Sequence, residues 1–234
     1  MQYSQLITQS DKFFWHGYIP FYEQFFKDRD FKSIAEIGVF KGNSVRWLLE
    51  RFPNSKVRAG DILPVQDTWP QDARVDYQQM DQAQSADVDA FFDNNAFDLI
   101  IDDGSHIPAH QVTSLVTGWN SLESGGIYIL EDIHTNLGHN KGTAMSALMA
   151  IDHCLRTGLP FNFDKITENN YMTAPDAANI VSSLKRISFF RRTQLPLSCY
   201  SCGSTDFDYS QLRCRCGVDL FSATDSMTCV IEKI

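Results

Sequence analysis

The stretch SIAEIGVFKGNSVRWLLERF, residues 33–52, joins two patterns of apolar residues through a glycine-containing turn. Its first part, 33–39, is a nearly continuous apolar run, which is typical of a strand buried on both faces of a sheet. In its second part, four apolar residues recur at the spacing of one helix face: Val45, Leu48, Leu49 and Phe52. The stretch therefore predicts a strand, a tight turn and a helix, which is the repeating unit of an α/β fold.

The same alternation continues along the chain. We expect further strands at 56–62, 75–81, 97–103 and 125–133, and helices at 42–52, 85–94, 108–122 and 143–158. Ser85 is expected to cap the second of these helices, and Pro108 lies in the first turn of the third. The order predicts a Rossmann-like, doubly wound, mostly parallel sheet with helices on both faces.

Composition limits the classes of function. The chain has 234 residues, 43% of them apolar, and a formal net charge of −9. This length suits one α/β domain, alone or with a small appendage. The acidic balance argues against nucleic acid as the main partner, and the basic stretch 184–192 is expected to be solvated. No apolar run approaches the roughly 20 residues that span a bilayer, and the N-terminus does not resemble a secretory signal. We therefore expect a cytoplasmic protein, with its cysteines reduced or metal-bound.

Acidic side chains follow every expected strand. In an open parallel sheet, ligands bind beyond the carboxyl ends of the strands. Carboxylates gathered at that edge repel one another unless a ligand or a metal ion balances their charge. The acids concerned are Glu36, Asp61, Asp81, Asp102, Asp103, Glu131 and Asp132.

The glycine turn by itself is a weak signal. Gly38 and Gly42 are separated by three residues, so the full dinucleotide fingerprint is absent. Such a turn can admit a ligand to a helix N-terminus, but it also serves plain strand–helix packing. Asp61 ends the second strand, where an acid commonly binds the hydroxyls of a ribose. With Asp81 after the third strand, the pattern favours a nucleoside ligand over a simple turn.

Three segments together resemble a known family: 35–62, DLIIDDGSH (98–106) and GGIYILEDIHT (125–135). They are similar to class I S-adenosylmethionine-dependent methyltransferases, and more narrowly to the metal-dependent sugar O-methyltransferases of macrolide and rhamnosyl natural-product pathways. The resemblance covers roughly residues 11–190 and the last strand. It implies a seven-stranded sheet whose last strand is antiparallel and pairs with 184–190. It also implies methyl transfer to a hydroxyl of a sugar, a glycosylated natural product or a polysaccharide.

The resemblance implies roles for five residues around the cofactor S-adenosyl-L-methionine. Glu36 and Gly38 would border its methionine end, and Asp61 would hold the ribose hydroxyls. Asp81 would lie by the adenine, and Asp102 would lie near the amino group of the cofactor.

The remaining acids would form the metal and catalytic centre. The resemblance implies that Asp103, Glu131 and Asp132 hold a divalent ion and that His106, with Asp103, is catalytic, His106 being the base. The chemistry suits these types, because an all-oxygen ligand set favours Mg²⁺ and a metal ion lowers the pKa of a hydroxyl. Histidine can accept a proton near neutral pH. Taken singly, each acid could instead be a strand-end or cap residue, and the histidine a surface residue.

The N-terminal segment 1–30 precedes the first strand and is rich in aromatic residues. His16 and Tyr18 could contact the acceptor from a lid, or the segment could only pack against the domain. Two further histidines lie near the proposed centre in the sequence, and we expect neither to be catalytic: His110 and His134.

A cysteine-rich insert, 191–224, interrupts the catalytic domain, which we place at 31–190 plus 225–234. Two pairs of cysteines, each followed by glycine, are typical of knuckles that hold one structural Zn²⁺: Cys199, Cys202, Cys214 and Cys216. Two disulfides or free thiols are the alternatives. Such an insert could also bind a protein partner or a second subunit. Cys154 and Cys229 are expected to be ordinary buried residues.

Two other functions compete with methyl transfer. An iron-dependent oxygenase could use Asp103, His106 and Glu131, although that class needs two histidines and one carboxylate. A non-catalytic scaffold with a zinc ribbon as its binding part is the other alternative. An oxygenase of this kind would not bind S-adenosylmethionine, and neither would such a scaffold.

Overall fold

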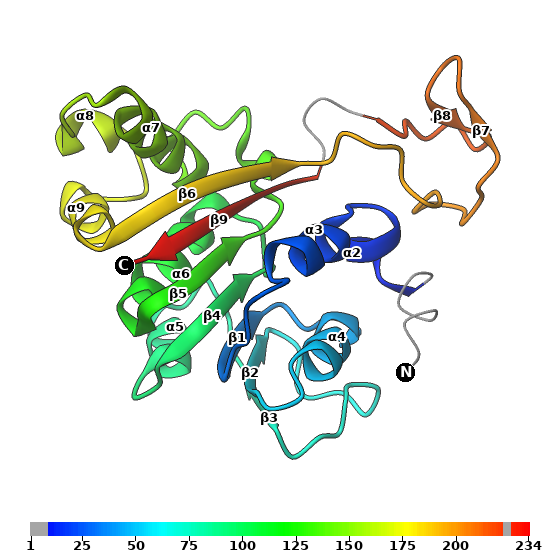
Figure 1. Ribbon diagram of the computed structural model, residues 1–234, viewed down its shortest axis with the longest axis horizontal. Helices are drawn as coiled ribbons and strands as arrows, with labels where there is room; N and C mark the ends of the chain where they lie inside the picture. The colour runs from blue at the N-terminus through cyan, green and yellow to red at the C-terminus, as the bar shows by residue number, and fades with distance from the viewer. Residues whose placement is uncertain (1–8, 222–225) are drawn as a thin grey trace.

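The computed structural model describes residues 9–221 and 226–234 (Figure 1). Residues 1–8 of the predicted segment 1–30, 222–224 of the predicted insert 191–224, and 225 of the predicted catalytic segment 225–234 lie outside the described ones. Seven strands form one sheet in the order β3-β2-β1-β4-β5-β9-β6. Their bounds are β1 Ser33–Ile37, β2 Lys56–Asp61, β3 Val75–Gln79, β4 Phe97–Asp102, β5 Leu122–Leu130, β6 Leu184–Arg191 and β9 Met227–Lys233.

The pairing of these strands confirms the predicted topology. β1 to β5 are mutually parallel, whereas β9 runs antiparallel to both neighbours, β5 and β6. Because all five parallel strands point the same way, their carboxyl ends meet at one edge. A second sheet, of β7 (Phe207–Asp208) and β8 (Arg213–Cys214), lies in the cysteine insert.

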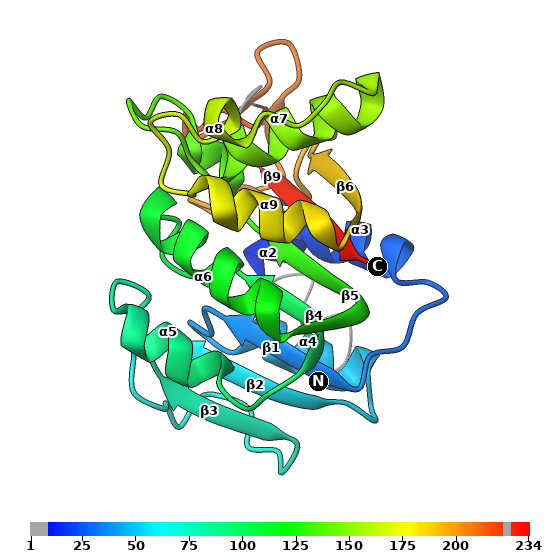
Figure 2. The same ribbon diagram turned by 90° about the vertical axis from the view of Figure 1, so that its left-hand side faces the viewer.

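Helices cover both faces of the large sheet (Figure 2). One face packs against α5, α6, α7 and α9, and the other packs against α3 and α4. The helix bounds are α2 Asp11–Phe14, α3 Tyr18–Phe25, α4 Asn43–Arg51, α5 Ser85–Phe92, α6 Pro108–Ser121, η1 Ile133–Asn136, α7 Ala144–Thr157, α8 Phe163–Ile166 and α9 Ala174–Ser182. Two buried cores result, one on each face, as a doubly wound sheet requires.

The glycine turn after β1 brings the strand ends close together. Gly38 has a φ of +93°, and its N–H donates to the carbonyl oxygen of Gly60 at 2.8 Å. A Cβ atom at this position would lie 2.6 Å from the carbonyl carbon of Asp103. The ends of β1, β2 and β4 can therefore approach this closely only around a glycine.

Several local predictions were wrong. Ser85 is the first residue of α5 and not its cap, since Gln84 holds the N-cap position without a side-chain hydrogen bond. β5 begins at Leu122, earlier than expected, because α6 runs directly into it. The helices α8 and α9 were not predicted; α9 starts in a capping box between Thr173 and Asp176. Among the described residues, no helix is long and apolar enough to cross a membrane.

Candidate active site

A cavity of about 660 Å³ opens at the carboxyl ends of β1, β2, β4 and β5. This volume lies within the range of small-molecule sites in proteins. Its lining includes most of the residues that the sequence singled out: Gly38, Asp61, Asp81, Asp103, His106, Glu131 and Asp132. Residues far apart in the chain therefore share one hollow.

Asp61 fastens the glycine turn to the end of β2. Its Oδ2 atom accepts the backbone N–H groups of Val39 at 2.7 Å and Phe40 at 2.8 Å, and its Oδ1 atom accepts the N–H of Leu63 at 2.9 Å. The carboxylate retains lone pairs on the cavity side, which is the chemistry needed to accept hydroxyl groups. Asp81 lines the same cavity after β3.

Asp102 is buried at the end of β4, beside the cavity. Its carboxylate is fully buried and accepts hydrogen bonds from Gln82 Nε2 at 3.0 Å and from the N–H of Gly104 at 3.3 Å. Asp102 does not line the cavity, because adjacent side chains at a strand end point to opposite faces and Asp103 takes the cavity side. Burial raises the pKa of Asp102 to about 7, and the hydrogen bond from Gln82 lowers it less. Its predicted contact with the cofactor amino group stays a prediction.

Gln82 was not predicted as a site residue. It lines the cavity, and its Oε1 atom accepts the N–H of Ser105 at 2.7 Å. Through its two ends it connects Asp102 to the loop that carries His106. A lone glutamine after a strand gives no signal of this role in the sequence.

Lys12 lies among the acids of the site, although it was not predicted to be a site residue. Its Nζ atom lies 3.3 Å from Glu36 Oε1, 2.9 Å from Asp103 Oδ2 and 3.2 Å from Glu131 Oε1. Burial alone would lower the pKa of Lys12, but the negative charges of Asp103, Glu131 and Glu36 outweigh burial and raise it well above its ordinary value. The ammonium group thus compensates three carboxylates that would otherwise repel one another.

Glu131 faces Lys12 and the N-terminal helices. Its Oε1 atom also accepts the O–H of Tyr22 at 2.9 Å. Burial raises the pKa of Glu131 well above its ordinary value, against the opposing effect of Lys12. Within the described part of the chain, the buried Oε2 atoms of Glu131 and Glu36 accept no hydrogen bond. Buried oxygens without partners are costly unless a ligand completes them.

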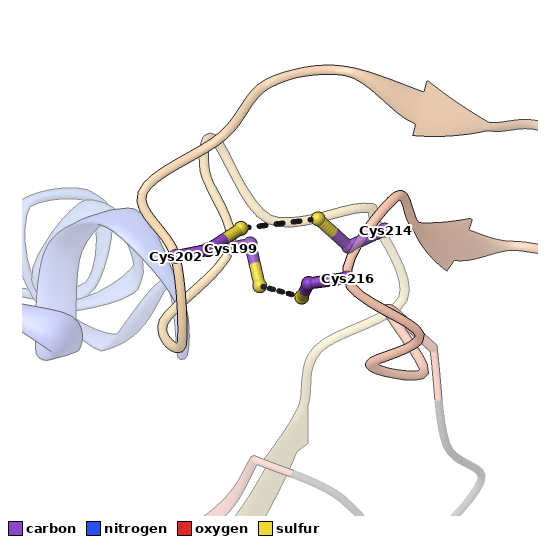
Figure 3. Close-up of side chains that lie close together, drawn as sticks. All are labelled: Cys199, Cys202, Cys214 and Cys216. Atoms are coloured by element: carbon purple, nitrogen blue, oxygen red, sulfur yellow. Dashed lines mark hydrogen bonds between the residues drawn. The ribbon is translucent and has the colours of Figure 1, made fainter.

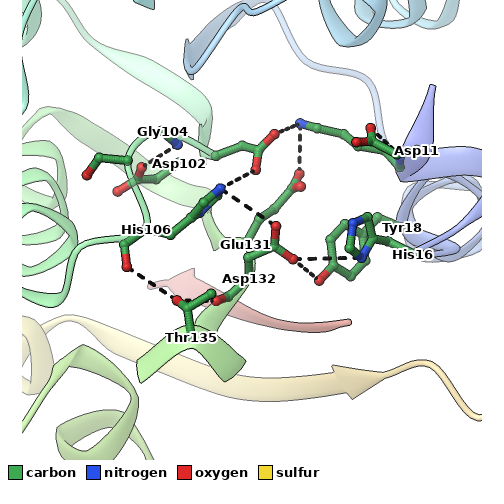
Figure 4. A network of polar contacts seen from close by, with 12 residues as sticks. Asp11, His16, Tyr18, Asp102, Gly104, His106, Glu131, Asp132 and Thr135 are labelled. Atoms are coloured by element: carbon green, nitrogen blue, oxygen red, sulfur yellow. Dashed lines mark hydrogen bonds and ion pairs between the residues drawn. The ribbon is translucent and has the colours of Figure 1, made fainter. Parts of the chain in front are cut away.

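His106 and Asp132 point toward each other in Figure 4, and Asp103, at the end of β4, lies close to His106. His106 Nε2 lies 3.8 Å from Asp103 Oδ1 and 3.7 Å from Asp132 Oδ2. One ligand atom of each residue lies within 4.8 Å of the other two, a spacing that could hold a metal ion. Both His106 and Asp132 have left-handed backbones, with φ of +55° and +50°. Such conformations in residues other than glycine are uncommon and gather at functional sites.

The N-terminal segment reaches the same carboxylate. Asp132 Oδ1 accepts the O–H of Tyr18 at 2.6 Å and lies 3.9 Å from His16 Nδ1. His134 Nδ1 approaches it at 3.8 Å, whereas His110 pairs with Ser105 instead. Of the predicted metal ligands, the structure therefore brings Asp103 and Asp132 together with His106, and places Glu131 with Lys12. The donor set of carboxylate oxygens and one imidazole fits a divalent cation.

The four insert cysteines form a second cluster (Figure 3). Their ligand atoms all lie within 4.8 Å of one another, with Sγ–Sγ distances of 3.6 Å for Cys199 and Cys216 and 3.5 Å for Cys202 and Cys214. These distances exceed the disulfide length of about 2.05 Å. They approach the spacing of four thiolates about 2.3 Å from a tetrahedral Zn²⁺. The cysteine pattern therefore fits zinc, and Cys154 and Cys229 lie outside the cluster.

Known proteins similar to this chain were found by sequence and by structure. No protein-family profile matches it. A tetracenomycin-C rhamnosyl 2'-O-methyltransferase of Streptomyces olivaceus is 35% identical over 138 residues, which is 54% of this chain and 36% of the relative. The 3'-O-methyltransferase for the 2-methoxy-rhamnosyl form, from the same organism, is 28% identical over 59% of this chain and 38% of the relative. Mycinamicin VI 2''-O-methyltransferase of Micromonospora griseorubida is 32% identical over 52% of this chain and 33% of the relative.

The matched region thus spans only about a third of each of these curated relatives. Among solved structures, the MycE methyltransferase of the mycinamycin pathway, in complex with Mg and SAH, matches 98% of this chain and 52% of its own, with a TM-score of 0.65 and 22% sequence identity. The chain has the fold of class I methyltransferases, and in sequence it is similar to the sugar O-methyltransferases of natural-product pathways.

Proposed function

We propose that the chain is an S-adenosylmethionine-dependent and Mg²⁺-dependent O-methyltransferase that acts on a sugar hydroxyl of a glycosylated natural product. The observation that carries the proposal is the single cavity that joins the Gly38 turn and Asp61 to the cluster of Asp103, His106 and Asp132. The first group suits a nucleoside and the second suits a hydroxyl that must lose its proton. The relatives, whose names describe O-methylation of rhamnosyl tetracenomycin-C and of mycinamicin VI, support the substrate class.

His106 would act as the general base. The acceptor oxygen would form a bond to the methyl carbon while the C–S bond breaks, and the hydroxyl proton would pass to Nε2 of His106. Asp103 and Asp132 flank this nitrogen at 3.8 and 3.7 Å and would stabilise the imidazolium. When bound by Asp103 and Asp132, with Glu131 as the third predicted ligand, Mg²⁺ would lower the pKa of the hydroxyl.

The geometry offers His106 a second role, as a metal ligand. Replacing it with alanine separates the two. As the base, His106→Ala should lower turnover by about 10²- to 10⁴-fold and leave the affinity for Mn²⁺, measured by calorimetry, nearly unchanged. As a ligand, the same change should lower the Mn²⁺ affinity as well. His110→Ala is the matched control, because His110 lies on α6 and pairs with Ser105.

The test of the whole function is calorimetry with S-adenosylhomocysteine and Mg²⁺, followed by methyl transfer from labelled S-adenosylmethionine to a rhamnosylated acceptor. We expect saturable binding of the cofactor product and metal-dependent labelling. A chain that binds no S-adenosylhomocysteine would instead be a scaffold or an oxygenase, and the proposal would fail.

The cysteine cluster is proposed to hold one structural Zn²⁺. Four thiolates leave no open coordination position for a substrate, so the ion would serve folding and not catalysis. Metal analysis of the purified protein should find one zinc per chain. Zinc-free protein with four titratable thiols in the insert would refute this assignment.

A further inference from the structure

We propose that the four-cysteine insert anchors helix α2, and thereby holds Lys12 and His16 at the acidic end of the cavity. The inference rests on the proposed function for the identity of the cavity's ligand, but the anchoring itself is independent of it. In Figure 1, α2 lies between the carboxyl ends of the central strands and the insert. Helix α2 and the residues next to it contact both the insert and the acids of the cavity.

The insert shares its small core with the N-terminal segment. Trp15, which directly follows α2, is only 6% exposed and packs in one cluster with Cys199, Cys214 and Leu220. The ring of Tyr200 meets Trp15 edge to face, with 4.6 Å between ring centroids. An aromatic side chain of this size is the main apolar mass of so small a cluster, so neither part is fully packed without the other.

Polar contacts fix the same junction. The N–H of Leu197 donates to the carbonyl oxygen of Phe14 at 2.7 Å. The guanidinium of Arg192 lies 4.9 Å from the ring centroid of Trp15. His16 Nδ1 lies 2.9 Å from Ser226 Oγ, at the point where the chain enters β9. The insert thus holds this segment through one backbone hydrogen bond and one cation–π contact, and Ser226, just beyond the insert, adds a side-chain contact.

Helix α2 cannot hold its position by itself. It has four residues, and its N-cap residue Ser10 makes no side-chain cap. Isolated helices of this length are unstable in water. Yet Lys12, inside α2, contacts the carboxylates of Glu36, Asp103 and Glu131, and His16, just after it, approaches Asp132. The support must come from tertiary contacts. Phe13 packs against the core of the large domain, whereas Phe14 and Trp15 pack with the insert.

The insert also forms part of the cavity wall. Tyr200 lies between Cys199 and Cys202 in the first knuckle, lines the cavity and is 59% exposed. Folding of the knuckle therefore decides both where α2 lies and where this ring faces the ligand. Metal binding supplies folding energy to small cysteine-rich units. Metal bound by the four cysteines would therefore stabilise the position of α2, although no cysteine takes part in the reaction.

Hydrogen exchange measured by mass spectrometry tests the anchoring directly. The double variant Cys202→Ser with Cys216→Ser removes the two exposed thiols of the cluster. We expect exchange protection over residues 10–17 to fall by about tenfold or more, while α7 keeps its protection, because local opening follows the loss of local contacts. The control is Cys154→Ser, on α7 and outside the cluster. Unchanged protection over 10–17 in a variant that has lost its zinc would overturn the proposal.

A second set of three variants tests the cavity wall without changing the cysteines. Tyr200→Ala should raise the dissociation constant of S-adenosylhomocysteine about fivefold to tenfold and lower the exchange protection of residues 10–17. The free energy of one edge-to-face aromatic pair corresponds to a change in an equilibrium constant of about this size. Tyr200→Phe should restore both values. Tyr209→Ala, which removes an exposed tyrosine of the same insert that does not line the cavity, should change neither.

The two proposals fail separately. Wild-type protein that binds no S-adenosylhomocysteine would refute the methyltransferase function, while the exchange data would still decide the anchoring. Tyr200→Ala and Tyr209→Ala with equal protection over 10–17 would refute the anchoring, whatever the cofactor affinity.

Discussion

Replacing Gly38 with alanine should separate backbone strain from steric conflict at the centre of the site. Gly38 has a φ of +93°, which costs an L-residue about 1–2 kcal/mol. The added Cβ would also lie 2.6 Å from the carbonyl carbon of Asp103 and closer still to its oxygen, whereas ordinary contact begins at 3.4 Å. The neighbour is backbone, and it would have to move by a large part of an ångström or more.

That movement has a structural cost that can be estimated. The N–H of Asp103 donates to the carbonyl oxygen of Ile37 at 2.9 Å, so displacing this backbone weakens the junction between β1 and β4. Adding an overpacking penalty to the strain, we expect Gly38→Ala to lower the free energy of unfolding by about 3–5 kcal/mol. Binding of S-adenosylhomocysteine should also be lost, because the turn and Asp103 both line the cavity.

Urea denaturation followed by circular dichroism measures the change, with Gly158→Ala as the control. Gly158 ends α7 with a φ of +71°, and no atom of the described residues lies within 4 Å of a Cβ built there. Its substitution should cost only about 1 kcal/mol, from strain alone. If the two variants lose equal stability, Gly38 makes no close approach to Asp103 and the reasoning is wrong.

Three further outcomes are expected. Glu232→Gln should cost about 2 kcal/mol of unfolding free energy at pH 7. Burial raises the pKa of Glu232, but the hydrogen bonds and charges of Arg29 and Arg186 outweigh burial and lower the pKa on balance. A lowered pKa stabilises the fold above the ordinary value of 4.5 and loses that effect as the pH falls, so wild type and variant should converge in acid denaturation, and a constant difference would contradict this. Lys12→Met should lower the melting temperature of the metal-free protein, because the ammonium group that balances Asp103 is gone. Adding Mg²⁺ should then raise the melting temperature more than in the wild type. An equal rise in both proteins would show that Lys12 and Mg²⁺ do not compete for Asp103. Asp61→Ala should raise the dissociation constant of S-adenosylhomocysteine about tenfold or more, as calorimetry would show, because the glycine turn loses its fastening.

Much of the fold could be read from local patterns. Continuous apolar runs and helical spacing predicted the five parallel strands and the helices between them, because strand and helix periods differ in the sequence itself. The acids at the strand ends could be assigned to one edge, since parallel strands in a doubly wound sheet all end on the same side. The spacing of the four cysteines likewise predicted that their sulfur atoms would meet.

Other features depended on which side chain faces which neighbour. Asp102 and Asp103 are adjacent acids at the end of the same strand. Because side chains alternate along a strand, Asp102 is buried and Asp103 faces the cavity. Nothing adjacent to Lys12 indicates that it sits among Glu36, Asp103 and Glu131, because those contacts join residues up to 119 positions apart. Periodicity records only local geometry, so the charge balance of the site and the junction of Trp15 with the insert were decided by tertiary packing alone.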